Sequence, residues 1–66
     1  MFYVKDAVSN LYYSHTVRHP DGDEVVWVKR EQFAWVSTRN ERAQALCSHL
    51  TDVEGYRCEV IEIKGE

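Results

Sequence analysis

Residues 38–63, TRNERAQALCSHLTDVEGYRCEVIEI, decide the fold because they combine a helix start, an apolar helix face and a strand. Thr38 and Glu41 have the spacing of a capping box, in which each side chain accepts a hydrogen bond from the backbone amide of the other residue. Apolar side chains then recur at the spacing of one helix face, at Ala43, Leu46, Cys47 and Leu50. The stretch therefore predicts a capped helix that buries one face.

The residues after this helix predict a turn and a final strand. We expect Val53 to close the end of the apolar helix face and Gly55 to form a tight turn. Residues 56–63 alternate between apolar and polar side chains, as a half-buried strand does, until the last isoleucines change the parity. A bulge or an edge twist near Val60 is the expected explanation.

The N-terminal segment predicts the start of a strand at residues 2–5, followed by an ambiguous stretch at residues 6–10. This stretch forms either a turn or a bulge within one longer strand. From residue 11 to residue 18 the alternation is regular, and it predicts one strand face that carries Leu11, Tyr13, His15 and Val17.

Residues 19–23, HPDGD, are typical of a tight turn, because proline presets φ and glycine accepts a positive φ. A strand is expected at residues 24–30, and residues 33–36 form either a third short strand or the extended lead into the helix. With 66 residues for a single domain, the sequence predicts an α+β fold. Its antiparallel sheet has three to four strands in the order ββ(β)αβ, and a single helix covers one face.

The formal net charge is −3, from 11 acidic and 8 basic residues, so the chain lacks the basic excess that nonspecific phosphate binding requires. No apolar run approaches the roughly 20 residues that a membrane-spanning helix needs, and no secretory signal pattern is found. We expect a cytoplasmic protein with no membrane partner. Cys47 and Cys58 are expected to act as small apolar residues in a reducing compartment, although the sequence leaves open whether they pair.

The reactive side chains lack the spacing that catalysis or metal binding needs. His15 and His19 belong to a strand and a turn, and Cys47 and His49 point to nearly opposite sides of a helix. Cys47, in a buried apolar face, has neither a base nor an oxyanion donor. A chain this short is also expected to leave no room for a ligand pocket of roughly 300 Å³ or more. We expect no enzyme activity, no cofactor and no metal.

Large aromatic rings are many for a chain of this length: Phe2, Tyr3, Tyr12, Tyr13, Trp27, Phe33, Trp35 and Tyr56. Because Tyr12 and Tyr13 are adjacent, they lie on opposite faces of a strand, and at least one is outside the helix-covered core. Such rings either fill the edge of a thin core or form a recognition surface. The alternative functional hypothesis is therefore nucleic-acid binding on an aromatic and basic sheet face, made by Tyr12 or Tyr13 with Arg18, Lys29 and Arg30.

Acidic side chains gather in two places. The expected hairpin tip carries Asp21, Asp23 and Glu24. The last strand and its approach carry Asp52, Glu54, Glu59, Glu62 and Glu66. These side chains either keep the domain soluble or meet a basic groove on a partner. All of them except Glu66, together with Tyr12 and Tyr13, are the candidate partner-binding residues.

A helix opened by Thr38 and Glu41, and followed by a Gly-aromatic-x-x-Glu-Val strand, resembles small phage-encoded host-takeover proteins, such as anti-CRISPR proteins and inhibitors of host RNA polymerase. The matching residues cover under half of the chain and are Thr38, Glu41, Ala43, Gly55, Tyr56, Glu59 and Val60. The resemblance implies a stoichiometric, noncatalytic inhibitor that occupies a surface of a larger host assembly. The acidic side chains add the expectation that this partner, a host protein or ribonucleoprotein complex, has a basic, nucleic-acid-binding groove. The sequence leaves open a homodimer that hides the bare sheet face.

Overall fold

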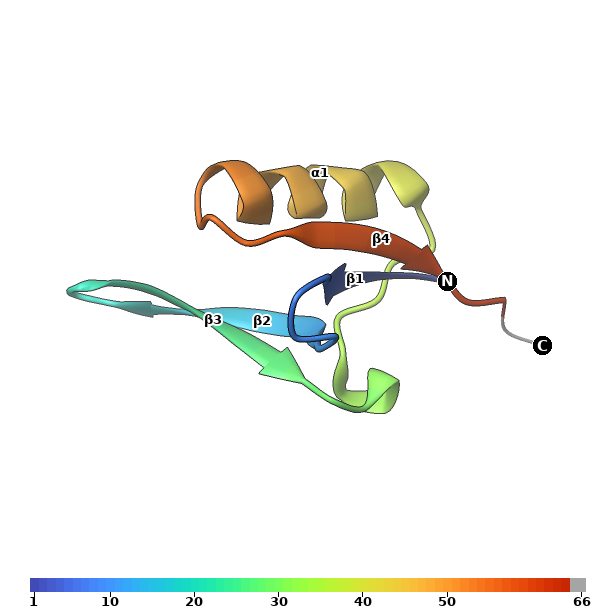
Figure 1. Cartoon of the computed structure of the whole chain (residues 1–66), viewed down its shortest axis with the longest axis horizontal. Helices are drawn as coiled ribbons and strands as arrows, with labels where there is room; N and C mark the ends of the chain where they lie inside the picture. Colours follow the sequence, from blue (N-terminus) through green and yellow to red (C-terminus); the bar gives the residue numbers. More distant parts are fainter. Residues whose placement is uncertain (65–66) are drawn as a thin grey trace.

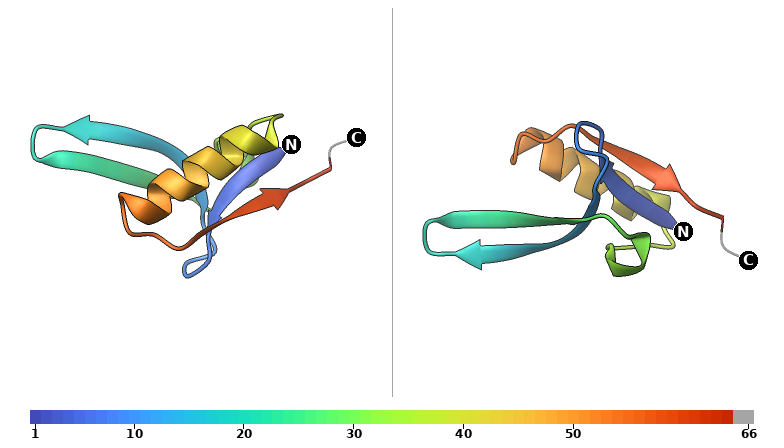
Figure 2. Two further views of the ribbon diagram at one scale, coloured as in Figure 1. Left: turned by 90° about the horizontal axis from the view of Figure 1, so that it is seen from above. Right: turned by 60° about the horizontal axis from the view of Figure 1, so that its bottom comes forward.

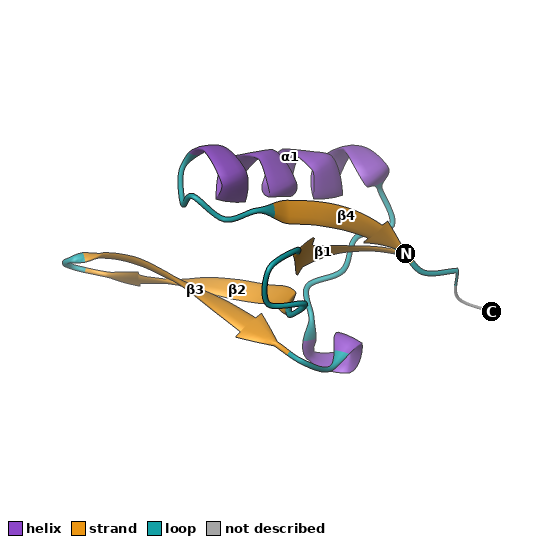
Figure 3. Cartoon of the chain, in the orientation of Figure 1, coloured by secondary structure: helices purple, strands orange, loops and turns teal. Residues whose placement is uncertain are grey.

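The computed structural model describes residues 1–64 and shows an antiparallel four-stranded sheet with one helix on one face (Figure 1; Figure 3). The spatial strand order is β3-β2-β1-β4, and the strands are β1 (Phe2–Asp6), β2 (Tyr12–His19), β3 (Gly22–Val28) and β4 (Cys58–Glu62). Helix α1 (Asn40–Asp52) packs on β1 and β4, and a short 3₁₀ helix, η1 (Glu31–Phe33), follows β3. The predicted α+β class and antiparallel sheet are confirmed.

Helix α1 buries the apolar face that the sequence predicts, made of Ala43, Leu46, Cys47 and Leu50. The prediction for Val53 is wrong, since this side chain is 66% exposed just beyond the last helical residue. The chain instead turns at Gly55, whose φ of 81° confirms the predicted turn and favours glycine. The helix face therefore closes at Leu50, which is fully buried.

The predicted capping box is wrong. Helix α1 begins at Asn40 after Arg39, and no side-chain hydrogen bond caps its first turn. Ser37 holds the helix entry in its place, because its Oγ accepts a hydrogen bond from the Arg39 amide at 3.0 Å and lies 3.2 Å from the Arg39 carbonyl oxygen. Ser37 reaches this position because its own backbone is paired with Phe2 of β1.

Strand β2 departs from regular alternation at Ser14. Its register with β3 passes from Tyr13↔Trp27 to His15↔Val26, so Ser14 is one extra residue in β2. Such a bulge exchanges the faces of all the side chains that follow it. Thr16 consequently lies on the face of Tyr13, with the two hydroxyl oxygens 2.7 Å apart. The prediction that His15 and Val17 share a face with Tyr13 is therefore wrong, since both point to the opposite side of the sheet.

Strand β4 pairs regularly with β1, from Phe2↔Glu62 to Asp6↔Cys58, and it is shorter than the predicted 56–63. The predicted irregularity near Val60 is wrong. Val60 packs against the core, whereas Ile61 lies opposite Tyr3 on the face away from the helix. Both faces of β4 thus carry apolar side chains, and this is why the apolar pattern loses its alternation.

Between β1 and β2, residues 6–10 form a turn, the first of the two alternatives. The Asn10 amide donates to the Asp6 carbonyl oxygen at 2.8 Å, and Asn10 has a positive φ of 62°. The Asp6 side chain, 8% exposed, closes the turn by accepting hydrogen bonds from the Val8 amide at 3.1 Å and the Ser9 hydroxyl at 2.8 Å.

The register pair between β1 and β2 is Lys5↔Tyr12, at one end of each strand. Away from this point the strands diverge, and the extended residues 34–37 lie between them. The Trp35 amide donates to the Tyr13 carbonyl oxygen at 2.8 Å, and Ser37 exchanges backbone hydrogen bonds with Phe2. Residues 34–36 are thus the extended lead into the helix, while Phe33 belongs to η1.

The β2–β3 hairpin continues past the helix as an arm. Figure 1 and Figure 2 show its tip beyond the end of α1, and the molecule measures 41 × 21 × 20 Å along its principal axes. The predicted turn is confirmed: β3 starts at Gly22, whose φ is 141°. We call residues 18–24, the end of this hairpin, the acidic arm.

Candidate functional site

The aromatic rings divide between the core and the uncovered sheet face. Tyr13 is 7% exposed and packs edge-to-face against Trp27 and Trp35, with ring centroids 6.0 and 6.5 Å away. Tyr56 also packs edge-to-face against Trp27, with ring centroids 5.1 Å apart. Tyr13 was a predicted partner-binding residue, and that prediction is wrong because its ring faces the helix side and is buried in the core.

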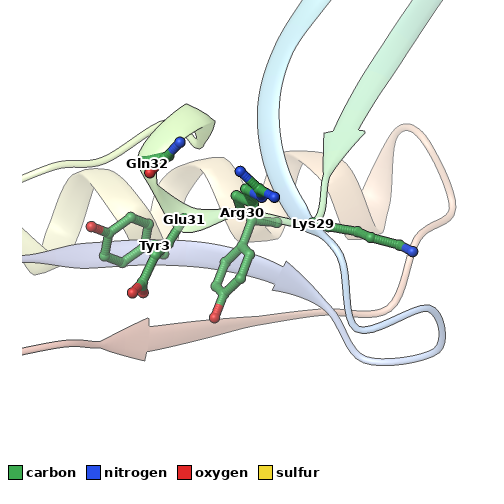
Figure 4. A pocket seen from close by; sticks show the side chains of 6 residues that line it. Tyr3, Lys29, Arg30, Glu31 and Gln32 are labelled. Carbon is green, nitrogen blue, oxygen red and sulfur yellow. The ribbon is translucent and has the colours of Figure 1, made fainter.

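Tyr12 lies on the opposite face, where it meets Tyr3. Their ring centroids are 5.8 Å apart and the ring planes are inclined at 65°. The two rings form one corner of an open hollow of about 600 Å³, which we call the tyrosine hollow and which is lined by Tyr3, Tyr12, Lys29, Arg30, Glu31 and Gln32 (Figure 4). The expectation that so short a chain leaves no room for a pocket is therefore wrong.

Three separate segments build the tyrosine hollow. Tyr3 precedes the buried Val4 in β1, and Tyr12 precedes the buried Tyr13 in β2, so strand alternation places both rings away from the helix. Residues 29–32 add the remaining side, where the chain leaves β3 and enters η1. The divergence of β1 and β2 leaves the space between these segments.

Part of the tyrosine hollow was predicted from the sequence. Tyr12, Lys29 and Arg30 are brought together as the alternative hypothesis expected, whereas Arg18 lies opposite Asp23 near the tip of the arm. Tyr3 was missed as a candidate, although its position between Phe2 and Val4 predicts that it faces away from the core.

The predicted acidic residues of the arm are exposed and lie near one another. Asp23 and Glu24 are consecutive residues of β3, so they point to opposite faces of the arm. Glu24 Oε1 lies 3.0 Å from His19 Nε2, at hydrogen-bond distance. Asp21 occupies the turn itself.

The second predicted acidic group is not a single patch. Asp52 is the last residue of α1 and is exposed, and Glu54 lies two residues beyond it. Glu59 lies opposite Lys5 on the uncovered sheet face, whereas Glu62 lies opposite Phe2 and points to the helix side. Glu66, the fifth acidic residue of this group in the sequence, is outside the described residues.

The two cysteines are free, half-buried thiols between α1 and β4. Burial raises the pKa of both, and the nearby Cys47 helps raise the pKa of Cys58 to about 11. Since the thiolate is the reactive form, this environment opposes a nucleophilic role. Within the part of the chain that the structure describes, no three His, Cys, Asp or Glu side chains are grouped to hold a metal ion.

Comparisons with protein-family models, with curated proteins and with solved structures found no match to this chain. No helix within residues 1–64 is long and apolar enough to cross a membrane. The fold and its surfaces thus define a small α+β protein with two separate features: a projecting acidic arm, and a tyrosine hollow on the sheet face that the helix leaves uncovered.

Proposed function

We propose that the protein is a noncatalytic inhibitor of the anti-CRISPR type, encoded by a phage or mobile element, which acts in the host cytoplasm. It binds a larger host complex and blocks a nucleic-acid-binding surface. The observation that carries this proposal is the acidic arm, which projects beyond the helix and presents exposed carboxylates at its tip. An arm of this shape and charge fits a basic groove, where its carboxylates take the place of nucleic-acid phosphates.

The distribution of charge on the arm supports insertion into a groove. Asp23 and Glu24 point to opposite faces of the arm, so both walls of a groove would meet a carboxylate. Within the described residues, Glu24 is hydrogen-bonded to His19, whereas Asp21 and Asp23 have no ion-pair partner. These two carboxylates keep their charge available to a basic partner, and the net charge of −3 steers the whole chain toward it.

The state of the thiols supports a noncatalytic role. Cys58, with its pKa raised to about 11, stays protonated at neutral pH, and burial also raises the pKa of Cys47. The buried carboxylate of Asp6 is engaged by Val8 and Ser9 in closing a turn. The two thiols are therefore held in their less reactive, protonated form, and the Asp6 carboxylate is committed to the turn.

The test is affinity capture from a bacterial lysate, with and without nuclease, followed by mass spectrometry. The proposal expects a large nucleic-acid-handling protein complex that stays bound after nuclease treatment. Loss of every captured protein after nuclease would contradict it and assign the contact to nucleic acid. Recovery of the bait alone would also contradict it, and the mass of the free protein in solution would then show whether a second copy covers the uncovered face.

A matched pair of variants tests the arm itself. Asp21→Asn with Asp23→Asn, and Glu59→Gln with Glu62→Gln, each change the formal net charge from −3 to −1, since two negative charges are removed. We expect the arm variant to lose the captured complex. The β4 variant should keep it, because Glu59 and Glu62 point to opposite faces of the sheet and form no single patch, contrary to the expectation from the sequence. Equal loss in both would show that total charge acts without insertion of the arm.

A further inference from the structure

The tyrosine hollow has the composition of a ligand site, and it is separate from the acidic arm. Tyr3 and Tyr12 are half-buried, so each ring keeps part of its surface exposed. Their planes are inclined at 65°, which lets a flat group lie on one ring while its edge meets the other. At about 600 Å³ the hollow is within the size range of small-molecule sites.

The charged side chains of the hollow are arranged unevenly. Figure 4 shows Lys29 and Arg30 on one side, with the Lys29 ammonium directed outward, and the Glu31 carboxylate on the side of Tyr3. Neither Lys29 nor Arg30 has an ion-pair partner within residues 1–64. Two cations against one carboxylate give this lining a local charge of +1, although the chain as a whole is acidic.

A flat aromatic group with an attached anion fits both observations. Nucleic-acid bases stack on tyrosine rings regardless of sequence, and lysine and arginine hold the adjoining phosphates. A base within a duplex has both faces covered by its neighbours, so stacking on these rings requires an unpaired base. The Tyr3 side carries Glu31, and phosphate is therefore expected on the opposite, cationic side.

We propose that the tyrosine hollow binds a nucleotide unit, with its base against Tyr3 and Tyr12 and its phosphate toward Lys29 and Arg30. The unit is either a free nucleotide or one residue of a single strand, because both present the same base and phosphate. This site goes beyond the inhibitor function. It is tested independently of the acidic arm, because the arm lies at the far end of the hairpin.

The experiment is an NMR titration of the ¹⁵N-labelled protein with adenosine monophosphate, with a thymidine oligomer of about ten nucleotides, and with a duplex of the same length. We expect shifts at the amides of Tyr3, Tyr12 and Arg30, and none along α1. Binding of the oligomer alone identifies a strand, and binding of the mononucleotide as well identifies a free nucleotide. Absence of binding by either, or shifts centred on α1, would overturn the proposal.

Three substitutions and one matched control locate the contacts. Tyr12→Leu removes a stacking ring and is expected to weaken binding about tenfold or more. Arg30→Ala removes a phosphate contact, and the slope of log affinity against log salt is expected to fall by about 0.7. Glu31→Gln is expected to strengthen binding. Arg42→Ala removes the same charge from α1, on the other face of the sheet, and is expected to change nothing.

Arg30→Ala is expected to leave the fold unchanged, because the Arg30 side chain does not cap η1 with a hydrogen bond. With one phosphate held at the site, raising the salt from about 50 to about 200 mM is expected to lower the wild-type affinity about threefold. Equal weakening by Arg30→Ala and Arg42→Ala would overturn the site, since attraction would then be diffuse. Variants that leave the oligomer titration unchanged but abolish capture of a protein complex would reassign the hollow to a protein partner.

Discussion

Asp6 illustrates how one buried carboxylate fixes a loop. Its Oδ1 accepts from the Val8 amide and its Oδ2 from the Ser9 hydroxyl. Asp6→Ala leaves these donors without partners and is expected to lower the free energy of unfolding by about 1–3 kcal/mol. Urea denaturation measures the loss. Asp6→Asn keeps one acceptor and should cost less, whereas the exposed Asp52→Ala should stay within about 0.5 kcal/mol. Equal losses for Asp6→Ala and Asp52→Ala would refute this role.

The raised pKa of Cys58 predicts that the protein loses stability at alkaline pH. Burial, and then the neighbouring Cys47, raise the folded-state pKa of Cys58 from 9.0 to about 11. The folded protein therefore holds the thiol proton more tightly than the unfolded chain does. The contribution of Cys58 to the free energy of unfolding is fully present below pH 9. It declines as the pH rises from 9 through 11. Denaturation at several pH values should show a shallower decline for Cys58→Ala than for the parent protein, and an identical decline would contradict the assignment.

The helix start shows how an element departs from its sequence motif. The spacing of Thr38 and Glu41 predicts a capping box, but pairing of Ser37 with Phe2 places a different hydroxyl beside the helix entry. Ser37→Ala removes the acceptor of the Arg39 amide and is therefore expected to lower the free energy of unfolding by about 1 kcal/mol. Thr38→Ala is the matched control and should stay within about 0.5 kcal/mol. If thermal or urea denaturation showed a larger loss for Thr38→Ala than for Ser37→Ala, the helix would be capped by Thr38 as the motif predicts.

Strand β2 is a second element whose geometry differs from what its sequence predicts. Residues 11–18 alternate well, yet Ser14 is inserted as a bulge because Tyr13 and Thr16 both lie on the side of Val25 and Trp27. The Ser14 hydroxyl also donates to the Phe33 carbonyl oxygen, 19 residues away, at 3.1 Å. Local periodicity cannot report a contact this distant. For the same reason the sequence predicted the hairpin turn but not the faces of the strand before it.

At the scale of the whole molecule, the sequence predicted the fold class and the helix face, because both follow from local spacing. It also placed Tyr12, Lys29 and Arg30 on one surface. It did not predict the tyrosine hollow, which requires β1 and β2 to diverge around residues 34–37. That divergence depends on backbone pairing between distant segments. The site is therefore a property of the tertiary structure, whereas the acidic arm is visible in the sequence of a single hairpin.

The same divergence gives Trp35 a central role in stability. Its amide bonds to Tyr13 in the hairpin, its ring packs edge-to-face on the Tyr13 ring, and it contacts the core beneath α1. Trp35 thus joins the hairpin to the unit formed by β1, β4 and α1. Trp35→Ala is expected to lower the free energy of unfolding by about 3 kcal/mol, and Trp35→Phe by less.

Hydrogen exchange distinguishes loss of this connection from a general loss of stability. In Trp35→Ala, backbone amides of the β2–β3 hairpin should lose protection before those of the β1–β4 pair, because the connection between the two units is weakened first. Phe33→Ala is the aromatic control: its ring is 62% exposed, and both measurements should barely change. If Phe33→Ala destabilises the chain as strongly as Trp35→Ala, or if protection falls uniformly, the two-unit description is wrong and the sheet unfolds as one body.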